Sequence, residues 1–166
     1  FAACDLKEKL DITVPFSFGM EGSLNLTIPN SGLNASFELR DSLQIDTISE
    51  VKEYQDRIKA IRLKSVEFGV TDFSGNGQAS LEGSLIFNGS FGSADAPFGP
   101  TNLQALSNAE EPLVLEFSTA EMEDISDALL AQEKLEIVFQ GEASNPPVSF
   151  DYSLDFFMEI VANPLD

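Results

Sequence analysis

The sequence contains no histidine, no tryptophan and a single cysteine, Cys4, among its 166 residues. Ser-His-Asp and Cys-His catalytic arrangements both need an imidazole, so both are excluded. The usual zinc sites of histidine and cysteine ligands are excluded for the same reason, and one cysteine cannot form a disulfide within the chain. Any bound metal would therefore be a cation that prefers oxygen ligands, such as Ca²⁺.

Basic residues are also few: nine Lys and Arg stand against 28 Asp and Glu, which gives a net charge of −19. Such a field repels phosphate backbones, so we expect no nucleic-acid partner. The negative charge favours cationic partners or divalent ions. The alternative is that it serves only to keep the protein soluble. No stretch approaches the roughly 18 consecutive apolar residues of a membrane-spanning helix.

The dominant pattern in the chain is alternation, and it is clearest in residues 148–160. The even-numbered positions there are apolar, and the odd positions from Ser149 to Asp155 are polar. Because successive strand side chains point to opposite faces, this pattern predicts a half-buried strand. Similar runs predict strands over 36–46, 63–71, 79–91, 113–117 and 135–139. Residues 10–18 and 24–28 are expected to form a hairpin about a turn at 19–22.

Two residues qualify these strand predictions. Pro15 has no N–H to donate, so residues 10–18 should form an edge strand or one whose position 15 faces out of the ladder. Asp41 falls in register with the apolar face of 36–46, which predicts a bulge or an edge there.

Two capping boxes predict helices between the strands. Thr47 and Glu50 precede a helical pattern over 48–60, and Ser118 and Glu121 precede a shorter one that ends near 131. Residues 92–109 are rich in Gly, Pro, Ser and Asn and are expected to form a long loop. Strand, capped helix, strand, turn and strand occur in this order twice, over 36–91 and 113–160, which suggests an internal repeat.

We therefore predict a mainly β protein: an antiparallel β-sandwich or barrel of about eight strands with two short capping helices. Residues 1–9 are expected to form an N-terminal tether and residues 10–166 a single β-rich domain.

The first four residues, Phe1-Ala2-Ala3-Cys4, resemble the lipobox of bacterial lipoproteins, usually written Leu-Ala/Ser-Gly/Ala-Cys. Ala2, Ala3 and Cys4 fit the pattern, and Phe1 stands where Leu is usual. In that family the signal peptide is cut just before the Cys, which then carries the lipid. The resemblance implies a lipid anchor on Cys4 and a place in the cell envelope, in the periplasm or at the outer membrane. The alternative is a free thiol on a frayed terminus.

A candidate metal site lies in residues 72–77. Asp72, Ser74 and Asn76 place oxygen-bearing side chains at alternate positions, and a glycine follows, as in the first half of a calcium loop of the EF-hand kind. The bidentate Glu of that family would fall on Gly83, and Glu82 is one residue early. We take Asp72, Ser74, Asn76 and Glu82 as candidate Ca²⁺ ligands; the alternative is a turn of ordinary turn residues.

No residue pattern indicates catalysis, so we predict a non-catalytic cell-envelope lipoprotein domain that acts as a structural or adhesive module. Its partner would be a carbohydrate, a protein or an apolar ligand. The alternative function is that of a carrier, with a cavity for a lipid or other apolar ligand that is lined by phenylalanines. An ordinary packed core would explain the same residues. These are Phe16, Phe18, Phe37, Phe68, Phe87, Phe139, Phe150 and Phe156. An enzyme based on carboxylates would need two acids facing each other in a cleft.

Overall fold

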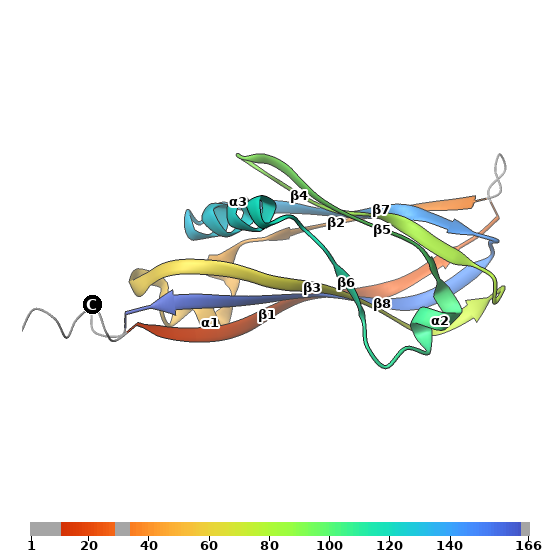
Figure 1. Ribbon diagram of the computed structural model, residues 1–166, viewed down its shortest axis with the longest axis horizontal. Coiled ribbons are helices and arrows are strands. Elements are labelled where there is room, and N and C mark those ends of the chain that lie inside the picture. Colours follow the sequence, from red (N-terminus) through yellow and green to blue (C-terminus); the bar gives the residue numbers. More distant parts are fainter. Residues whose placement is uncertain (1–10, 29–33, 164–166) are drawn as a thin grey trace, which may run out of the picture.

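The computed structural model describes residues 11–28 and 34–163 as two four-stranded antiparallel sheets packed face to face (Figure 1). The first sheet has the order β1 (Ile12–Leu26), β8 (Val148–Ala162), β3 (Ile58–Gly75) and β6 (Leu113–Leu115). The second has the order β2 (Asn34–Leu43), β7 (Leu135–Ser144), β4 (Ser80–Gly89) and β5 (Gly92–Asn102). This is the strand order of an eight-stranded jelly roll. The predicted sandwich is confirmed, and the two separate sheets decide against a barrel.

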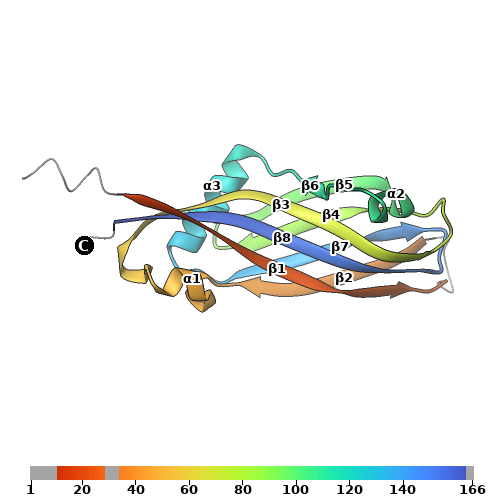
Figure 2. The same ribbon diagram turned by 90° about the horizontal axis from the view of Figure 1, so that it is seen from below.

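The helical segments lie between strands. After β2 come two 3₁₀ turns and a short helix: η2 (Ile45–Thr47), α1 (Ser49–Lys52) and η3 (Gln55–Arg57). The helices α2 (Leu103–Ser107) and α3 (Thr119–Leu130) flank β6 in the chain. Helix α3 packs against β3, β4 and β5, so it covers one side of the sandwich, as expected of a capping helix (Figure 2). No helix within the described ranges is long and apolar enough to cross a bilayer.

Strand β8 is paired along its length with β1 on one side and β3 on the other. Its even-numbered residues face the core as predicted, and Leu154, Phe156 and Ile160 are fully buried. Strand β1 is at the edge of the sheet, which confirms the prediction from Pro15.

The predicted hairpin over 10–28 is wrong. Strand β1 runs unbroken from Ile12 to Leu26 and pairs with β8 throughout, without a register shift. Gly22 lies opposite Tyr152, where a Cβ would come within 3.0 Å of the Tyr152 hydroxyl oxygen. The glycine therefore makes room for a ring inside a continuous strand, and does not mark a turn.

The first predicted helix is also wrong in extent. Only α1, four residues long, is α-helical, and β3 already begins at Ile58. Thr47 does not cap it: its hydroxyl donates to the carbonyl of Gln44 at 2.7 Å, and Glu50 instead accepts from Ser49. The apolar residues of the rest of the predicted helix face the core from short turns and from the start of a strand.

The second capping box is confirmed. The Ser118 hydroxyl accepts from the Glu121 amide at 3.3 Å, and a Glu121 carboxylate oxygen accepts from the Ser118 amide at 2.9 Å. Of the bulge and the edge strand predicted from Asp41, the structure shows the edge strand, because β2 lies at the edge of its sheet and pairs with β7 without a register shift. The long loop expected over 92–109 is wrong: strand β5 and helix α2 occupy most of it.

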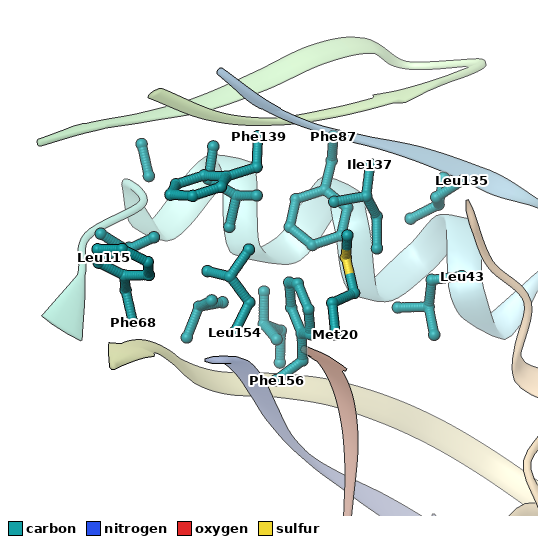
Figure 3. Packing of buried hydrophobic residues seen from close by; sticks show 14 of the residues in the cluster. Met20, Leu43, Phe68, Phe87, Leu115, Leu135, Ile137, Phe139, Leu154 and Phe156 are labelled. Atoms are coloured by element: carbon teal, nitrogen blue, oxygen red, sulfur yellow. The ribbon is translucent and has the colours of Figure 1, made fainter. Parts of the chain in front are cut away.

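Phenylalanine rings from both sheets interdigitate to form the core (Figure 3). Phe68 from one sheet contacts Phe139 from the other with ring centroids 5.1 Å apart, and Phe87 contacts Phe156 at 5.6 Å. Full burial of each such side chain stabilises the fold by about 1.5–3 kcal/mol. Seven of the eight phenylalanines proposed as cavity lining are buried, and Phe18 is half-buried against Phe156.

The two sheets are related in their strand order. Exchanging every strand with the strand four places along the chain converts the order β1-β8-β3-β6 into β5-β4-β7-β2, which is the second sheet read backwards. The predicted repeat of 36–91 and 113–160 requires this relation, because it equates β2 with β6, β3 with β7 and β4 with β8.

Candidate functional site

The outer face of the β2-β7-β4-β5 sheet carries a groove of about 760 Å³. Its polar lining comes from residues that alternate with core residues along three strands, so the same periodicity that builds the core places them outside. The lining residues are Ser36, Phe37, Glu38, Glu82, Gly83, Ser84, Phe98, Gln140, Gly141 and Glu142.

A row of two glycines between two phenylalanines crosses the sheet beneath this groove. The register pairs Phe37 with Gly141, Gly141 with Gly83, and Gly83 with Phe98. A Cβ on Gly83 would lie 2.0 Å from the Gln140 carbonyl oxygen, and one on Gly141 would lie 2.2 Å from that of Glu82. Real side chains do not approach backbone so closely, so only glycine permits this local geometry.

The two phenylalanines at the ends of the row are held by a third. Phe37 and Phe98 have ring centroids 5.3 Å and 5.4 Å from that of Phe139 in the core. Phe98 also contacts Phe68 of the opposite sheet at 5.9 Å. The base of the groove is therefore fixed to the interior of the sandwich, as a pre-formed binding surface requires.

Carboxylates dominate the rim. Glu82 and Glu142 are directly opposite in the β4–β7 pair, and both are exposed. Glu142 accepts only long hydrogen bonds, from Asn34 at 3.4 Å and Ser36 at 3.5 Å. Like charges directly opposite in an antiparallel pair are destabilising. The rim is thus arranged to accept hydrogen bonds or a positive charge from outside.

An ion-pair array borders the groove along the same face. Arg40 donates from Nε to Glu38 at 2.7 Å and from Nη1 to Glu136 at 2.6 Å, and Asn88 donates to Glu136 at 3.0 Å. The hydrogen bond to Glu38 is the main cause that raises the pKa of Arg40, followed by the bond to Glu136. The Asn88 amide, and after it Arg40, lowers the pKa of Glu136. Arg40 thereby orients Glu38 at the end of the groove.

Of the predicted metal ligands, Asp72 and Ser74 lie on β3, Asn76 lies in the turn that follows it, and Glu82 lies on β4 of the other sheet. Asp72 is at an irregularity of β3 and has φ of 51°, and Ser74 pairs with Ser149 of β8. The side-chain oxygen of Asn76 accepts from the Gln78 amide at 2.9 Å, as in a turn. Glu82 is in the groove of the other sheet. The described residues hold no group of three or more acidic or cysteine ligands, and calcium binding stays a prediction.

The other predicted site residue, Cys4, is outside the described ranges. Sequence reasoning missed the groove, although a signal for it exists. A glycine between two polar residues occurs in two strands, as Glu82-Gly83-Ser84 and Gln140-Gly141-Glu142. A lone glycine inside an alternating strand indicates a bulge or a close backbone approach.

No family model and no curated protein matches this chain. Solved structures of low similarity do. One of Desmodium yellow mottle tymovirus is 12% identical, with a TM-score of 0.41 over 94% of this chain and 89% of that chain. A decameric BFDV capsid protein is 10% identical, with a TM-score of 0.43 over 90% and 99%. One of turnip yellow mosaic virus is 12% identical, with a TM-score of 0.37 over 93% and 96%.

Proposed function

We propose that this chain is a non-catalytic binding module of the bacterial cell envelope that holds a polyhydroxylated ligand, such as a carbohydrate, in the groove of the β2-β7-β4-β5 sheet. The observation that carries the proposal is the groove itself, with its rim of carboxylates, amide and hydroxyl groups over a fixed base. Its volume of about 760 Å³ lies within the range of roughly 300–1,000 Å³ that ligand sites occupy.

The chemistry of the rim favours sugars. Glu38, Glu82 and Glu142 accept hydrogen bonds from hydroxyl groups, and hydrogen bonds to charged acceptors are stronger than those to neutral ones. Phe98, which is partly exposed, supplies apolar surface for the carbon face of a sugar ring. The three carboxylates repel acidic glycans, so we expect neutral sugars or amino sugars.

Binding without catalysis is the better account of the paired acids. Glu82 and Glu142 do face each other, as a carboxylate enzyme would require. A glycosidase, however, holds its acid catalyst in a secluded apolar setting, as lysozyme does, whereas both of these side chains are exposed on a shallow surface.

A lipid on Cys4 would tether the domain at the end opposite the groove. Cys4 precedes the start of β1 at Ile12, and Ile12 pairs with Ala162 at one end of the sandwich. At the other end, Leu26 pairs with Val148 and Asn34 pairs with Ser144, close to the groove residues Ser36 and Glu142 (Figure 1). The groove would therefore be held away from the membrane.

The apolar carrier has less support. The phenylalanines that would line its cavity pack against one another in the core. The groove of the β2-β7-β4-β5 sheet has only two phenylalanines, Phe37 and Phe98, among its lining residues.

A glycan array of neutral, amino and acidic sugars tests the groove. We expect binding of neutral or amino sugars, and a loss of about tenfold or more in affinity for Glu142→Gln, since a hydrogen bond to a charged group contributes about 1.5–3 kcal/mol. Glu123→Gln, which removes one charge from an exposed position on α3, is the matched control. A folded wild-type protein that binds no sugar, or one that releases sugar products, would contradict the proposal.

The tether is tested separately by the intact mass of the protein from its own host. We expect added lipid mass in the wild type and none in Cys4→Ser. An unmodified wild-type chain would remove the anchor while leaving the groove proposal standing.

A further inference from the structure

Two asparagines of the chain are followed directly by glycine, in the pairs Asn76-Gly77 and Asn88-Gly89. The backbone nitrogen of a residue can attack the side-chain carbon Cγ of a preceding asparagine and close a succinimide ring. Glycine obstructs this attack least because it has no side chain. The sequence therefore makes both asparagines chemically reactive to a similar degree, and the structure decides between them.

Asn76 lies in the turn between β3 and β4, and its side chain is exposed. Its backbone carbonyl accepts from the Ala79 amide at 2.8 Å, and its side-chain oxygen accepts from the Gln78 amide at 2.9 Å. The side chain of Asn76 thus folds back over Gly77. The Gly77 amide donates no hydrogen bond to another of the described residues, so the attacking nitrogen is not held in place.

The hydrogen bond from Gln78 also suits the reaction electrostatically. As the Gly77 nitrogen attacks Cγ of Asn76, negative charge develops on Oδ1. The Gln78 N–H already donates to this oxygen. A donor directed at an oxygen where charge develops lowers the barrier, as in an oxyanion hole.

Asn88 is held much more firmly. It lies in β4, between β5 and β7, where it pairs with Ser93 on one side and Glu136 on the other. Its side-chain nitrogen donates to a carboxylate oxygen of Glu136 at 3.0 Å. Ring closure at Asn88 requires this hydrogen bond and the surrounding strand pairing to open. Opening of a central strand costs more free energy than movement within an exposed turn.

We propose that Asn76 is a site of spontaneous deamidation in the folded protein, and that Asn88 is protected from the same reaction. The Gly77 nitrogen loses its proton and bonds to Cγ of Asn76, and the bond from Cγ to Nδ2 breaks as Nδ2 leaves in ammonia. Water then opens the succinimide at either carbonyl and yields aspartate or isoaspartate. Overall an amide and water become an acid and ammonia, so no oxidant, reductant or cofactor takes part.

The modification changes the turn in two ways. Both products carry a carboxylate at position 76, so each adds one negative charge to the segment that contains Asp72 and Ser74. The isoaspartate product also lengthens the backbone between β3 and β4 by a methylene group. Deamidation at Asn76 does not depend on whether this segment binds Ca²⁺, and it is independent of the groove on the other sheet.

Peptide mapping by mass spectrometry tests the proposal in the wild-type protein. The folded protein is incubated at mildly alkaline pH, and the acid products at the two asparagines are followed over time. We expect deamidation of Asn76 to be at least about tenfold faster than that of Asn88, because only Asn88 needs strand opening. In urea the two rates should converge, which would show that folding and not sequence separates them.

Gly77→Ala tests the role of the attacking nitrogen. The added Cβ would lie 2.5 Å from Oε1 of Gln104, the end of a flexible side chain, and Gly77 is not among the glycines with positive φ, so the fold should accept alanine. The methyl group hinders ring closure and should slow deamidation of Asn76 by about tenfold. Gln78→Ala keeps both Gly77 and the backbone N–H at position 78, so as the matched control it should leave the rate unchanged.

Four results would each overturn the proposal. They are equal rates at Asn76 and Asn88 in the folded protein, faster reaction at Asn88, no product at Asn76 in folded protein when the chain in urea reacts, and an unchanged rate at Asn76 in Gly77→Ala.

Discussion

The charge of Asp41 on β2 affects the pKa of Tyr152 on β8, although the two strands belong to different sheets. Burial is the larger cause that raises the pKa of the Tyr152 phenol, and the negative charge of Asp41 raises it further. Asp41, which interrupts the apolar pattern of β2, therefore influences the ionisation of Tyr152, the residue on the apolar face of β8 that carries a hydroxyl group.

This coupling predicts a pH dependence. Because the pKa of Tyr152 is higher in the folded state than in the unfolded chain, folding stability is retained below pH 10 and falls as the pH rises through the folded-state pKa. In a Tyr54→Phe background, which leaves Tyr152 as the only tyrosine, an absorbance titration should place its pKa above the usual value. Asp41→Asn should bring the pKa down and weaken the loss of stability. An unchanged titration in Asp41→Asn would refute the coupling.

Gly83→Ala should destabilise the protein by about 3 kcal/mol or more in urea unfolding, since overpacking against backbone forces the strands apart. Gly19→Ala is the matched control in another strand. Its Cβ would lie 3.2 Å from a carboxylate oxygen of Asp155, the end of a partly exposed side chain that can move, so its effect should be within about 1 kcal/mol. Equal effects of the two changes would show that the glycine row is not required.

Ser118→Ala should lower stability by about 1 kcal/mol, the usual cost of losing an N-cap. Ser118→Thr should restore most of it, because Thr keeps the hydroxyl that caps the helix and donates to Glu121. The Ser118 hydroxyl, followed by the Asp95 and Ser118 amides, lowers the pKa of Glu121. The stability due to Glu121 is therefore present above its unfolded pKa and is lost as the pH falls through its lower folded pKa. Urea unfolding across this pH range measures both effects.

The calcium prediction is best tested with Asp72→Asn. Asp72 has φ of 51°, a conformation that Asn tolerates and that would strain Ala. If residues 72–76 bind Ca²⁺, the ion should raise the melting temperature of the wild type, chelator should reverse the rise, and Asp72→Asn should lose it. A wild-type melting temperature that is the same with Ca²⁺ and with chelator would make the prediction wrong.

Long alternating runs carried most of the fold prediction. Residues 148–160 identified the central strand and its buried face because period-two patterning follows directly from strand geometry. Glycine was harder to interpret. Gly19 and Gly22 looked like a turn, yet pairing with β8 holds them extended, and only the partner residue Tyr152 explains Gly22. A local sequence window does not contain that partner.

The two capping boxes show the same limit. Ser118 and Glu121 cap a helix that buries Ile125 and Leu129 completely. Thr47 and Glu50 precede a segment that forms only a short helix before β3 begins at Ile58. Packing of its apolar residues against the core therefore overrides the helix signal of the capping box. The groove depends on neighbours brought together from β2, β4, β5 and β7, and the strand order that does so cannot be read from any one strand.

The continuous pairing of β1 with β8 also decides how the domain would bear a load. A ligand held near Glu142 and an anchor before Ile12 would pull the sandwich from its two ends, along the strands. The hydrogen bonds between β1 and β8, from Ile12 to Leu26, would then be loaded in shear, all together, and would not open one after another. A hairpin in place of β1 would unzip from its end under the same force. If the proposed function holds, the unbroken strand would make this domain a mechanical link as well as a binding surface.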